Sequence, residues 1–199
     1  NGNIPVHAFN LISPTFFANS STGNKYSLWV NVYGVSERYL NVYGEKDLRA
    51  QMNQFFHRTY THPVDGTTLD MKMLCNWYWY DETAILETGK GTKDWNFYRY
   101  AETLLSAAEA IAQSSGVNAE AAGYLAQVKA RANMEGKDVS TIASELQRLG
   151  KQAFIEECWK ERLREFPLEM KIWDDCVRTG KFPQISATNK GEVQFVDLI

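Results

Sequence analysis

The sequence lacks the features that define several large classes of protein. Its three cysteines, Cys75, Cys158 and Cys176, form no C-x-x-C pair and are odd in number, so a disulfide framework is not indicated. Cys158 and Cys176 fall on apolar faces of expected helices, which predicts buried thiols. A Cys158–Cys176 disulfide is the alternative. No apolar run approaches the roughly 20 residues that a membrane helix needs, and residues 1–5 do not have the pattern of a signal peptide.

An excess of basic residues and the common catalytic motifs are also missing. The chain has 21 Lys and Arg against 24 Asp and Glu, for a net charge of -3, and the two signs are interspersed, which argues against a nucleic-acid partner. His7, His57 and His62 do not have the spacing of metal ligands. There is no P-loop, no nucleophile elbow and no Gly-rich dinucleotide turn. We therefore predict no catalytic residue, no metal and no cofactor.

Aromatic residues are abundant, with six Trp, ten Tyr and ten Phe. Most of them lie in the first hundred residues. In residues 1–94 Gly, Asn, Ser and Pro interrupt short aromatic and β-branched runs. This half is predicted to be irregular and loop-rich with short strands, one of them at Met73–Tyr80, where Trp77 and Trp79 would share a face. A short helix is expected at residues 45–56.

Residues 95–183 have the apolar spacing of successive helices. Small residues on the first of these helices permit close packing, and Gly and Pro separate the helices. The fold class expected is mainly α, with helical-hairpin (TPR-like) repeats in the C-terminal half and a polar tail at residues 184–199. The first helix is expected to bury a stripe that starts at Phe97 and to stop at Gly116. The second helix is expected to begin at Asn118, and the third is expected to be capped by Ser140. The fourth is expected to cover Lys151–Phe166, and the fifth to end at Gly180.

The charged residues on these helices are predicted to have a structural role. Glu161 and Arg164 are three positions apart and can pair on one helix face. Arg162 lies on an apolar face and is expected to reach a carboxylate of a neighbouring helix, Glu102 or Glu109. Buried pairs of this kind fix register more than they add stability. The residues predicted to be structural are Arg99, Glu102, Glu161, Arg162, Glu165 and Asp175.

Several stretches of the chain carry a family resemblance. They are YRYAETLL at 98–105 with VKARAN at 128–133, ERLREF at 161–166 with the residues up to Gly180, and KDLR at 46–49. Their order and spacing resemble the conserved pattern of SusD/RagB proteins. The chain departs from that pattern at Asn133 and Met170, where the family often has Gly, and at Ile172, where it often has Arg.

The resemblance implies a function. SusD-like proteins are non-catalytic, cell-surface glycan-binding proteins of the outer membrane, and they work with a SusC-like TonB-dependent transporter in nutrient uptake. The chain resembles the C-terminal portion of these longer proteins, and contact with the membrane would come only from a lipid anchor upstream of it. No nucleic acid is expected as a partner.

The resemblance places the predicted glycan-binding site among the aromatic residues of the segment 1–94, because the family forms its glycan platform largely from loops outside the helical repeats. Flat C–H patches of sugars stack on Trp and Tyr rings, and the hydroxyls need polar partners. The predicted ligand-binding residues are Tyr26, Trp29, Trp77 and Trp79, with Asn24 and Lys25 as polar neighbours. One alternative is that these rings form core or pack against the N-terminal portion of the longer protein. The others are that the protein is a TPR-like protein-protein adaptor or a carbohydrate-active enzyme.

Overall fold

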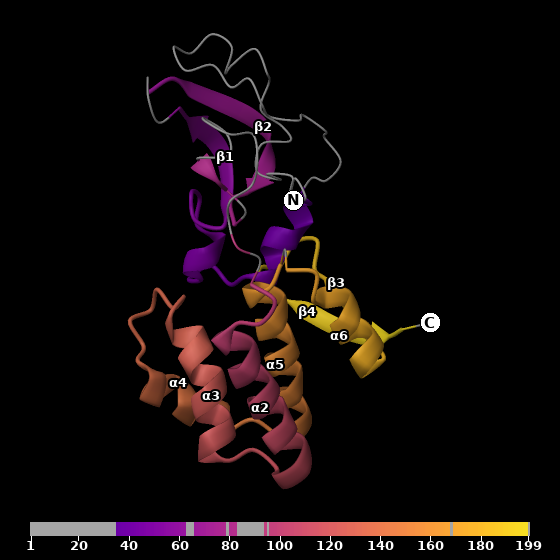
Figure 1. Ribbon diagram of the computed structural model, residues 1–199. Helices are drawn as coiled ribbons and strands as arrows, with labels where there is room; N and C mark the ends of the chain where they lie inside the picture. The colour runs from indigo at the N-terminus through magenta and orange to yellow at the C-terminus, as the bar shows by residue number, and fades with distance from the viewer. Residues whose placement is uncertain are drawn as a thin grey trace. The chain divides into compact units, whose positions relative to one another are not determined.

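The structure, a computed structural model, describes residues 35–62, 66–78, 80–82, 94, 96–167 and 169–198. The contacts within the chain divide it into two compact units. The hairpin unit comprises residues 1–37 and 50–95, and the helical unit comprises residues 38–49 and 96–199. α-Helices make up most of the second unit, with a few short strands beside them (Figure 1), which confirms the predicted mainly α fold class.

The described part of the hairpin unit is built on one antiparallel strand pair, β1 (Phe56–Thr61) and β2 (Thr68–Asn76). The register shifts between His57 and Thr59, as it does where a bulge interrupts a strand. Tyr60 is buried on β1. Thr and aromatic residues of this kind are favoured on a half-buried pleated surface.

The strand predicted at Met73–Tyr80 is correct only in its first half. β2 ends at Asn76, and the next residues form a turn in which Tyr80 N–H donates to Trp77 O over 3.1 Å. Trp77 N–H donates to Phe55 O over 2.7 Å. Trp77 therefore lies beyond the strand, and the alternation of a strand does not set the direction of its side chain.

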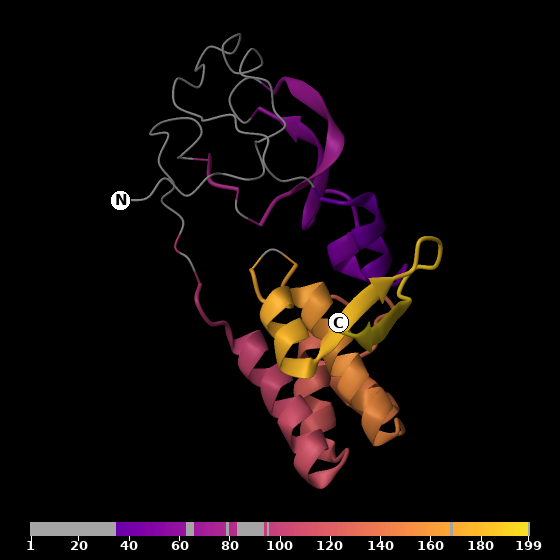
Figure 2. The ribbon, with the colours of Figure 1, turned by 90° about the vertical axis from the view of Figure 1, so that its right-hand side faces the viewer.

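The helices of the second unit agree closely with the predicted ones. α2 packs against α3 and α5, and α3 packs against α4, so that these helices run side by side in both ribbon views (Figures 1 and 2). In the part of the chain that the structure describes, no helix has the length and apolar character needed to cross a membrane. The helices are α2 (Tyr100–Ser115), α3 (Ala119–Ala130), α4 (Val139–Leu146), α5 (Lys151–Glu165) and α6 (Ile172–Thr179).

Helix ends follow local chemistry. Asn118 caps α3 as predicted, because its side chain accepts from Ala121 N–H at 2.9 Å. The predicted Ser140 cap of α4 is wrong. Asp138 is the cap and accepts from Thr141 N–H at 2.8 Å, and Ser140 lies inside the helix. A carboxylate accepts this bond more strongly than a hydroxyl does.

The core of the helical unit lies between α2, α3 and α5. Leu105, Leu125 and Phe154 are fully buried there, together with Cys158. Alanines of α2 and α3 are buried in this core, where the two helices pack against each other. This agrees with the close packing that the small residues of the first helix predicted. All three cysteines are free and buried, so the buried thiols are confirmed and the alternative Cys158–Cys176 disulfide is wrong.

The short helix predicted at residues 45–56 is also wrong. The chain forms only a 3-10 turn, η3 (Leu48–Ala50), and Asn53 adopts a left-handed φ of 63° that a helix does not allow. Leu48 N–H donates to Ala132 O, at the end of α3, over 2.8 Å. The backbone of Leu48 is therefore bound to a residue distant in the sequence and does not form the hydrogen bonds of a local helix.

The 3-10 helix η2 (Glu37–Val42) and the residues after it contact the end of α5. Tyr39 O–H donates to Leu163 O over 2.7 Å, and Tyr43 O–H donates to Arg164 O over 3.1 Å. The last carbonyls of a helix have no partner within it, so these two hydroxyls serve as its C-terminal cap. Burial raises the pKa of both tyrosines, which keeps the hydroxyls protonated as donors.

Residues 184–199, predicted to be a polar tail, instead contribute to a second antiparallel pair, β3 (Lys181–Ile185) and β4 (Val193–Asp197). Arg38 donates to Ile185 O over 2.5 and 2.7 Å. The Phe195 ring meets the Trp159 ring edge-on at 5.2 Å between centroids. The hairpin is thus held by residues far away in the sequence, which its own polar composition did not reveal.

Candidate functional site

A group of buried charged residues joins α2, α5 and the chain around η3. Its members are Arg49, Arg99, Glu161, Arg162, Arg164, Glu165 and Glu169, and we call them the charged cluster. Each is between 1% and 8% exposed except Arg99, whose side chain is 21% exposed. Full burial of charge is costly unless every group is paired, so the pairing decides what these residues do.

Glu161 is the most buried carboxylate of the cluster. Arg49 Nη1 donates to one of its oxygens at 2.9 Å, and Arg164 Nη1 donates to the other at 3.2 Å. The predicted Glu161–Arg164 pair is therefore present. Burial by itself raises the pKa of a carboxyl, but Arg49, Lys129 and Arg164 outweigh it and hold the pKa of Glu161 at about 2. The side chain stays ionised throughout the physiological range.

Glu165 accepts from three cations on separate elements. Arg49 Nη1 lies 3.0 Å from one oxygen, while Arg99 Nη1 and Arg131 Nη2 lie 2.9 and 2.7 Å from the other. Arg99 also forms a two-pronged contact with Glu169, at 2.9 and 2.6 Å, the geometry that suits a guanidinium best. The start of α2 is thereby fixed to the end of α5.

Arg162 makes the inter-helix contact that its position on α5 predicted. Its Nε donates to Asp175 of α6 at 2.7 Å, and its Nη2 lies 3.5 Å from Glu102 of α2. Glu102 is thus a partner, although Asp175 is the closer one. Glu109, the other candidate partner, instead accepts from Arg178 and from the indole N–H of Trp159.

A polar cavity of about 460 Å³ lies in the helical unit beside the loop at residues 44–49. Residues of the charged cluster, Arg49, Glu161 and Arg164, form part of its wall. Glu161 is only 1% exposed, so the cavity reaches the edge of the cluster and leaves its carboxylates covered. At the rim, Lys137 pairs with Glu135 and Glu145 at 3.0 Å each. The charged walls of this cavity are therefore largely neutralised by one another.

Most of the predicted ligand-binding residues lie outside the described residues. They are Tyr26, Trp29, Trp79, Asn24 and Lys25. Trp77 is described and half-buried. The His57 ring lies parallel to its indole at 4.0 Å between centroids, and the Tyr80 ring lies parallel to it at 4.8 Å. Trp77 thus offers a ligand less open ring face than a lone exposed indole would.

His57 contributes a second feature to this ring stack. Its Nε2 is buried and has no hydrogen-bond partner. Burial lowers the pKa of His57 more than backbone hydrogen bonds at Gln54 and Thr59 raise it. A neutral imidazole is therefore favoured, because the charged form would leave a buried N–H⁺ without an acceptor. Among the described residues, no group of His, Cys, Asp and Glu is arranged to hold a metal ion.

Comparison with known proteins decides the family. A profile of the SusD family matches residues 19–197, nearly the whole chain. The chain belongs to the SusD family. It is also similar to a SusD superfamily protein from Parabacteroides distasonis ATCC 8503, whose crystal structure was determined at 1.95 Å resolution, with 25% identity and a TM-score of 0.73. That match covers 96% of this chain and 38% of the other. No curated protein matches the sequence.

The departures from the SusD sequence pattern can now be placed. Met170 stands where the family often has Gly, and its φ is 60°, in the left-handed region that favours Gly. Met170 therefore carries backbone strain that a Gly at this position would not have. Asn133, the other replacement of Gly, accepts from Glu135 N–H at 2.9 Å and donates to Lys137 O at 3.0 Å, so its side chain holds the loop after α3.

Sequence reasoning missed one group of exposed side chains. Phe97 was expected on the buried stripe of the first helix, but α2 begins at Tyr100 and Phe97 is 70% exposed. Trp173 of α6 is also 63% exposed, whereas Cys176 on the same helix is buried. The helix starts only at Tyr100, so Phe97 and Tyr98 precede it and do not belong to its buried stripe.

Proposed function

We propose that this chain is part of a non-catalytic, cell-surface glycan-binding protein that works with a SusC-like TonB-dependent outer-membrane transporter in nutrient uptake. The observation that carries the proposal is the match to the SusD family over residues 19–197. The chain spans 38% of the length of the solved relative, so the activity of the whole protein is inferred from its family. The place of action proposed is the outer face of the outer membrane, with attachment through a lipid anchor upstream of this chain.

The state of the carboxyl groups supports a role without catalysis. A glycosidase needs a general acid whose pKa is raised and a second carboxylate across an open space. Among the described residues, every carboxyl with a resolved shift has its pKa lowered. These groups are Asp138, Glu157, Glu161 and Asp197. The buried carboxylates of the charged cluster also have their oxygens bound by cations.

Recognition is proposed to rest on aromatic rings in residues 1–94, with Tyr26, Trp29, Trp77 and Trp79 as stacking residues and Asn24 and Lys25 as polar neighbours. Rings supply a large rigid surface with few rotatable bonds, which limits the entropy lost on binding. The charged cluster is assigned to holding the helical unit together. Substitution of the aromatic residues should therefore change glycan binding, and substitution of the charged cluster should change stability.

Affinity electrophoresis through gels that contain starch, inulin, xylan, pectin or mucin tests the proposal. We expect retardation in at least one gel, and no release of reducing ends when the chain is incubated with the same polysaccharide. Release of reducing ends would instead assign an enzyme. A chain that runs unretarded in every gel but captures a SusC-like barrel transporter would indicate a protein adaptor.

The proposed stacking residues are tested by Trp29→Ala and Trp79→Ala in the gel that retards the wild-type chain. Loss of retardation with unchanged thermal unfolding supports a direct contact. Tyr100→Ala is the matched control, because Tyr100 is a 71% exposed ring in the other unit. Equal retardation of all these variants would remove the two tryptophans from the site.

A further inference from the structure

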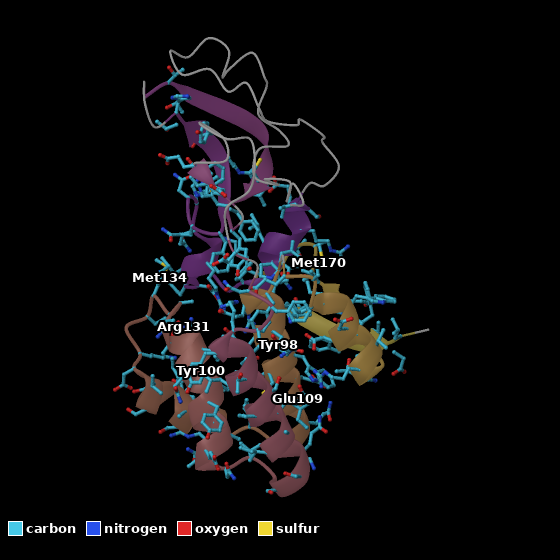
Figure 3. All side chains as sticks on the ribbon, in the orientation of Figure 1. Tyr98, Tyr100, Glu109, Arg131, Met134 and Met170 are labelled. Atoms are coloured by element: carbon cyan, nitrogen blue, oxygen red, sulfur yellow. The ribbon has the colours of Figure 1, made fainter. Side chains whose placement is uncertain are left out.

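Exposed apolar side chains gather where α2 and α6 begin. Phe97 and Tyr98 precede α2 and are 70% and 75% exposed. Met170 and Trp173 lie on either side of Lys171 in the chain and are 71% and 63% exposed. We call these five residues the ring patch. All belong to the helical unit, and Figure 3 labels Tyr98 and Met170 within it.

Lys171 joins the two halves of the ring patch. Its Nζ donates to Phe97 O at 2.9 Å and lies 3.1 Å from Glu102 Oε2. The same ammonium lies over the Phe97 ring, 5.8 Å from its centroid, and over the Tyr98 ring, 4.7 Å from its centroid. These are cation–π distances. The start of α2 and the start of α6 are therefore held side by side.

The exposed fraction of Lys171 differs strongly from that of the two rings it contacts. The side chain of Lys171 is only 17% exposed, while both rings above it are at least 70% exposed. The mostly buried Lys171 ammonium therefore lies against two rings that are largely open to solvent. The Phe97 and Tyr98 rings also meet edge-to-face at 5.5 Å. Open rings held in this way lose little conformational freedom when a ligand stacks on them.

Met170 adds a second observation. A φ of 60° is unfavourable for a non-Gly residue, and Met170 adopts that φ. Its side chain is 71% exposed, so packing within the helical unit does not offset the strain. Strain of this kind is found where a side chain has to be presented at a given place. Here it presents an apolar, adaptable group next to Lys171.

The small size of the ring patch favours a small ligand. A stable protein interface takes about 20–30 residues from each side, whereas the ring patch has five. Exposed aromatic rings and an exposed Met side chain match a small ligand that has flat apolar C–H faces. A sugar has such faces, and a short run of sugar units covers such a patch.

We propose that the ring patch is a glycan-stacking site, separate from the site proposed in residues 1–94. Tyr98 and Trp173 supply stacking faces, Phe97 and Met170 supply apolar contact, and Lys171 holds the Phe97 and Tyr98 rings in place. This inference rests on the proposed function and adds a second place of contact within the helical unit. A chain with two such contacts holds a long oligosaccharide more tightly than either contact alone.

The test compares Tyr98→Ala and Trp173→Ala with the matched control Tyr100→Ala. Tyr100 is a 71% exposed ring two residues from Tyr98, but its electrostatic neighbour is Tyr124 on α3. The wild-type chain and the three variants are titrated by calorimetry with oligosaccharides of the polysaccharide that retards the chain in gels. We expect Tyr98→Ala and Trp173→Ala each to raise Kd about three- to tenfold, and Tyr100→Ala to leave it unchanged.

The outcomes separate this inference from the proposed function. If the wild-type chain binds glycan and all three variants bind equally well, the ring patch is not a glycan site and the proposed function stands. If the wild-type chain binds no glycan, both fail. Loss of barrel capture in Tyr98→Ala, with glycan affinity unchanged, would assign the patch to a protein partner and overturn the inference.

A second measurement covers variants that fold poorly. Iodide quenching of tryptophan fluorescence is recorded with and without oligosaccharide for the wild-type chain and for Trp173→Phe. We expect the ligand to protect part of the wild-type emission and to protect less in Trp173→Phe. Equal protection in the two proteins would place the ligand away from Trp173 and overturn the inference.

Discussion

Arg49 donates to Glu161 over 2.9 Å although 112 residues separate them in the chain. The contact ties η3 to the middle of α5, and both partners are at least nine-tenths buried. A guanidinium and a carboxylate that are both removed from water depend on each other, because neither can be solvated elsewhere. The charged cluster is therefore expected to respond to substitution through stability and not through ligand affinity.

Glu161→Gln is expected to lower the free energy of unfolding by about 3–5 kcal/mol, the cost of leaving buried cations without their partner. Urea denaturation followed by circular dichroism measures it. The control is Glu156→Gln on the same helix, where the carboxylate accepts only from the exposed Gln152 side chain and a change within about 0.5 kcal/mol is expected. A loss below 1 kcal/mol in Glu161→Gln would contradict the structural role.

The same residue predicts a dependence on pH. The pKa of Glu161 is about 2 in the folded chain against 4.5 as the ordinary value, so the unfolded chain takes up its proton first as the pH falls. The stabilisation is complete above about pH 4.5 and is lost between pH 4.5 and 2. The difference in unfolding free energy between the wild-type chain and Glu161→Gln should therefore shrink over that window. A difference that stays constant down to pH 2.5 would exclude this linkage.

Arg162→Ala is expected to destabilise the helical unit by about 2–3 kcal/mol, because it removes charge-assisted hydrogen bonds to Asp175 and Glu102. Thermal unfolding measures the loss. Arg148→Ala serves as the control, since Arg148 is an exposed arginine of the same unit. A variant that melts like the wild-type chain but loses glycan binding would show that Arg162 contacts the ligand.

His57 is expected to titrate below 6.5, its ordinary pKa, because burial disfavours the imidazolium beside Trp77. The unfolded chain then takes up a proton that the folded chain resists, so lowering the pH through 6.5 favours unfolding of the hairpin unit. The pH titration of the His57 ring protons by NMR gives the value, with His57→Gln to assign the signal. A pKa of 6.5 or above would contradict the burial argument.

The three thiols are expected to be protected in the folded chain. Burial raises the pKa of Cys75 to about 11, and it raises the pKa of Cys158 and Cys176 as well. Because the thiolate is the reactive form, a thiol reagent should label none of them quickly at pH 8 and all three in denaturant without reductant. Detection of one thiol in denaturant would indicate that two of the cysteines are bridged.

Features that depend on neighbours in the sequence were predictable. Asn118 caps α3 through a residue three positions on, and Glu161 pairs with Arg164 at the same spacing. Ser140 failed as a cap because a stronger acceptor, Asp138, stands two positions before it. The unusual turn before α6 was signalled by Met170 at a Gly position, although the sequence could not say that the residue would accept the strain.

The sequence by itself determined the helical class of residues 100–179, the burial of Cys158 and Cys176 and the pairing of Glu161 with Arg164, because helical spacing and local pairing act over three or four positions. Only the tertiary structure decided that residues 45–56 do not form a helix, that residues 181–197 form a hairpin, and that Phe97, Tyr98 and Trp173 face solvent. In each of these cases the deciding contact joins residues far apart in the chain, such as Leu48 with Ala132, Arg38 with Ile185, and Lys171 with Phe97. Such contacts form only when the chain has closed on itself, so a pattern read along the sequence carries no direct signal of them.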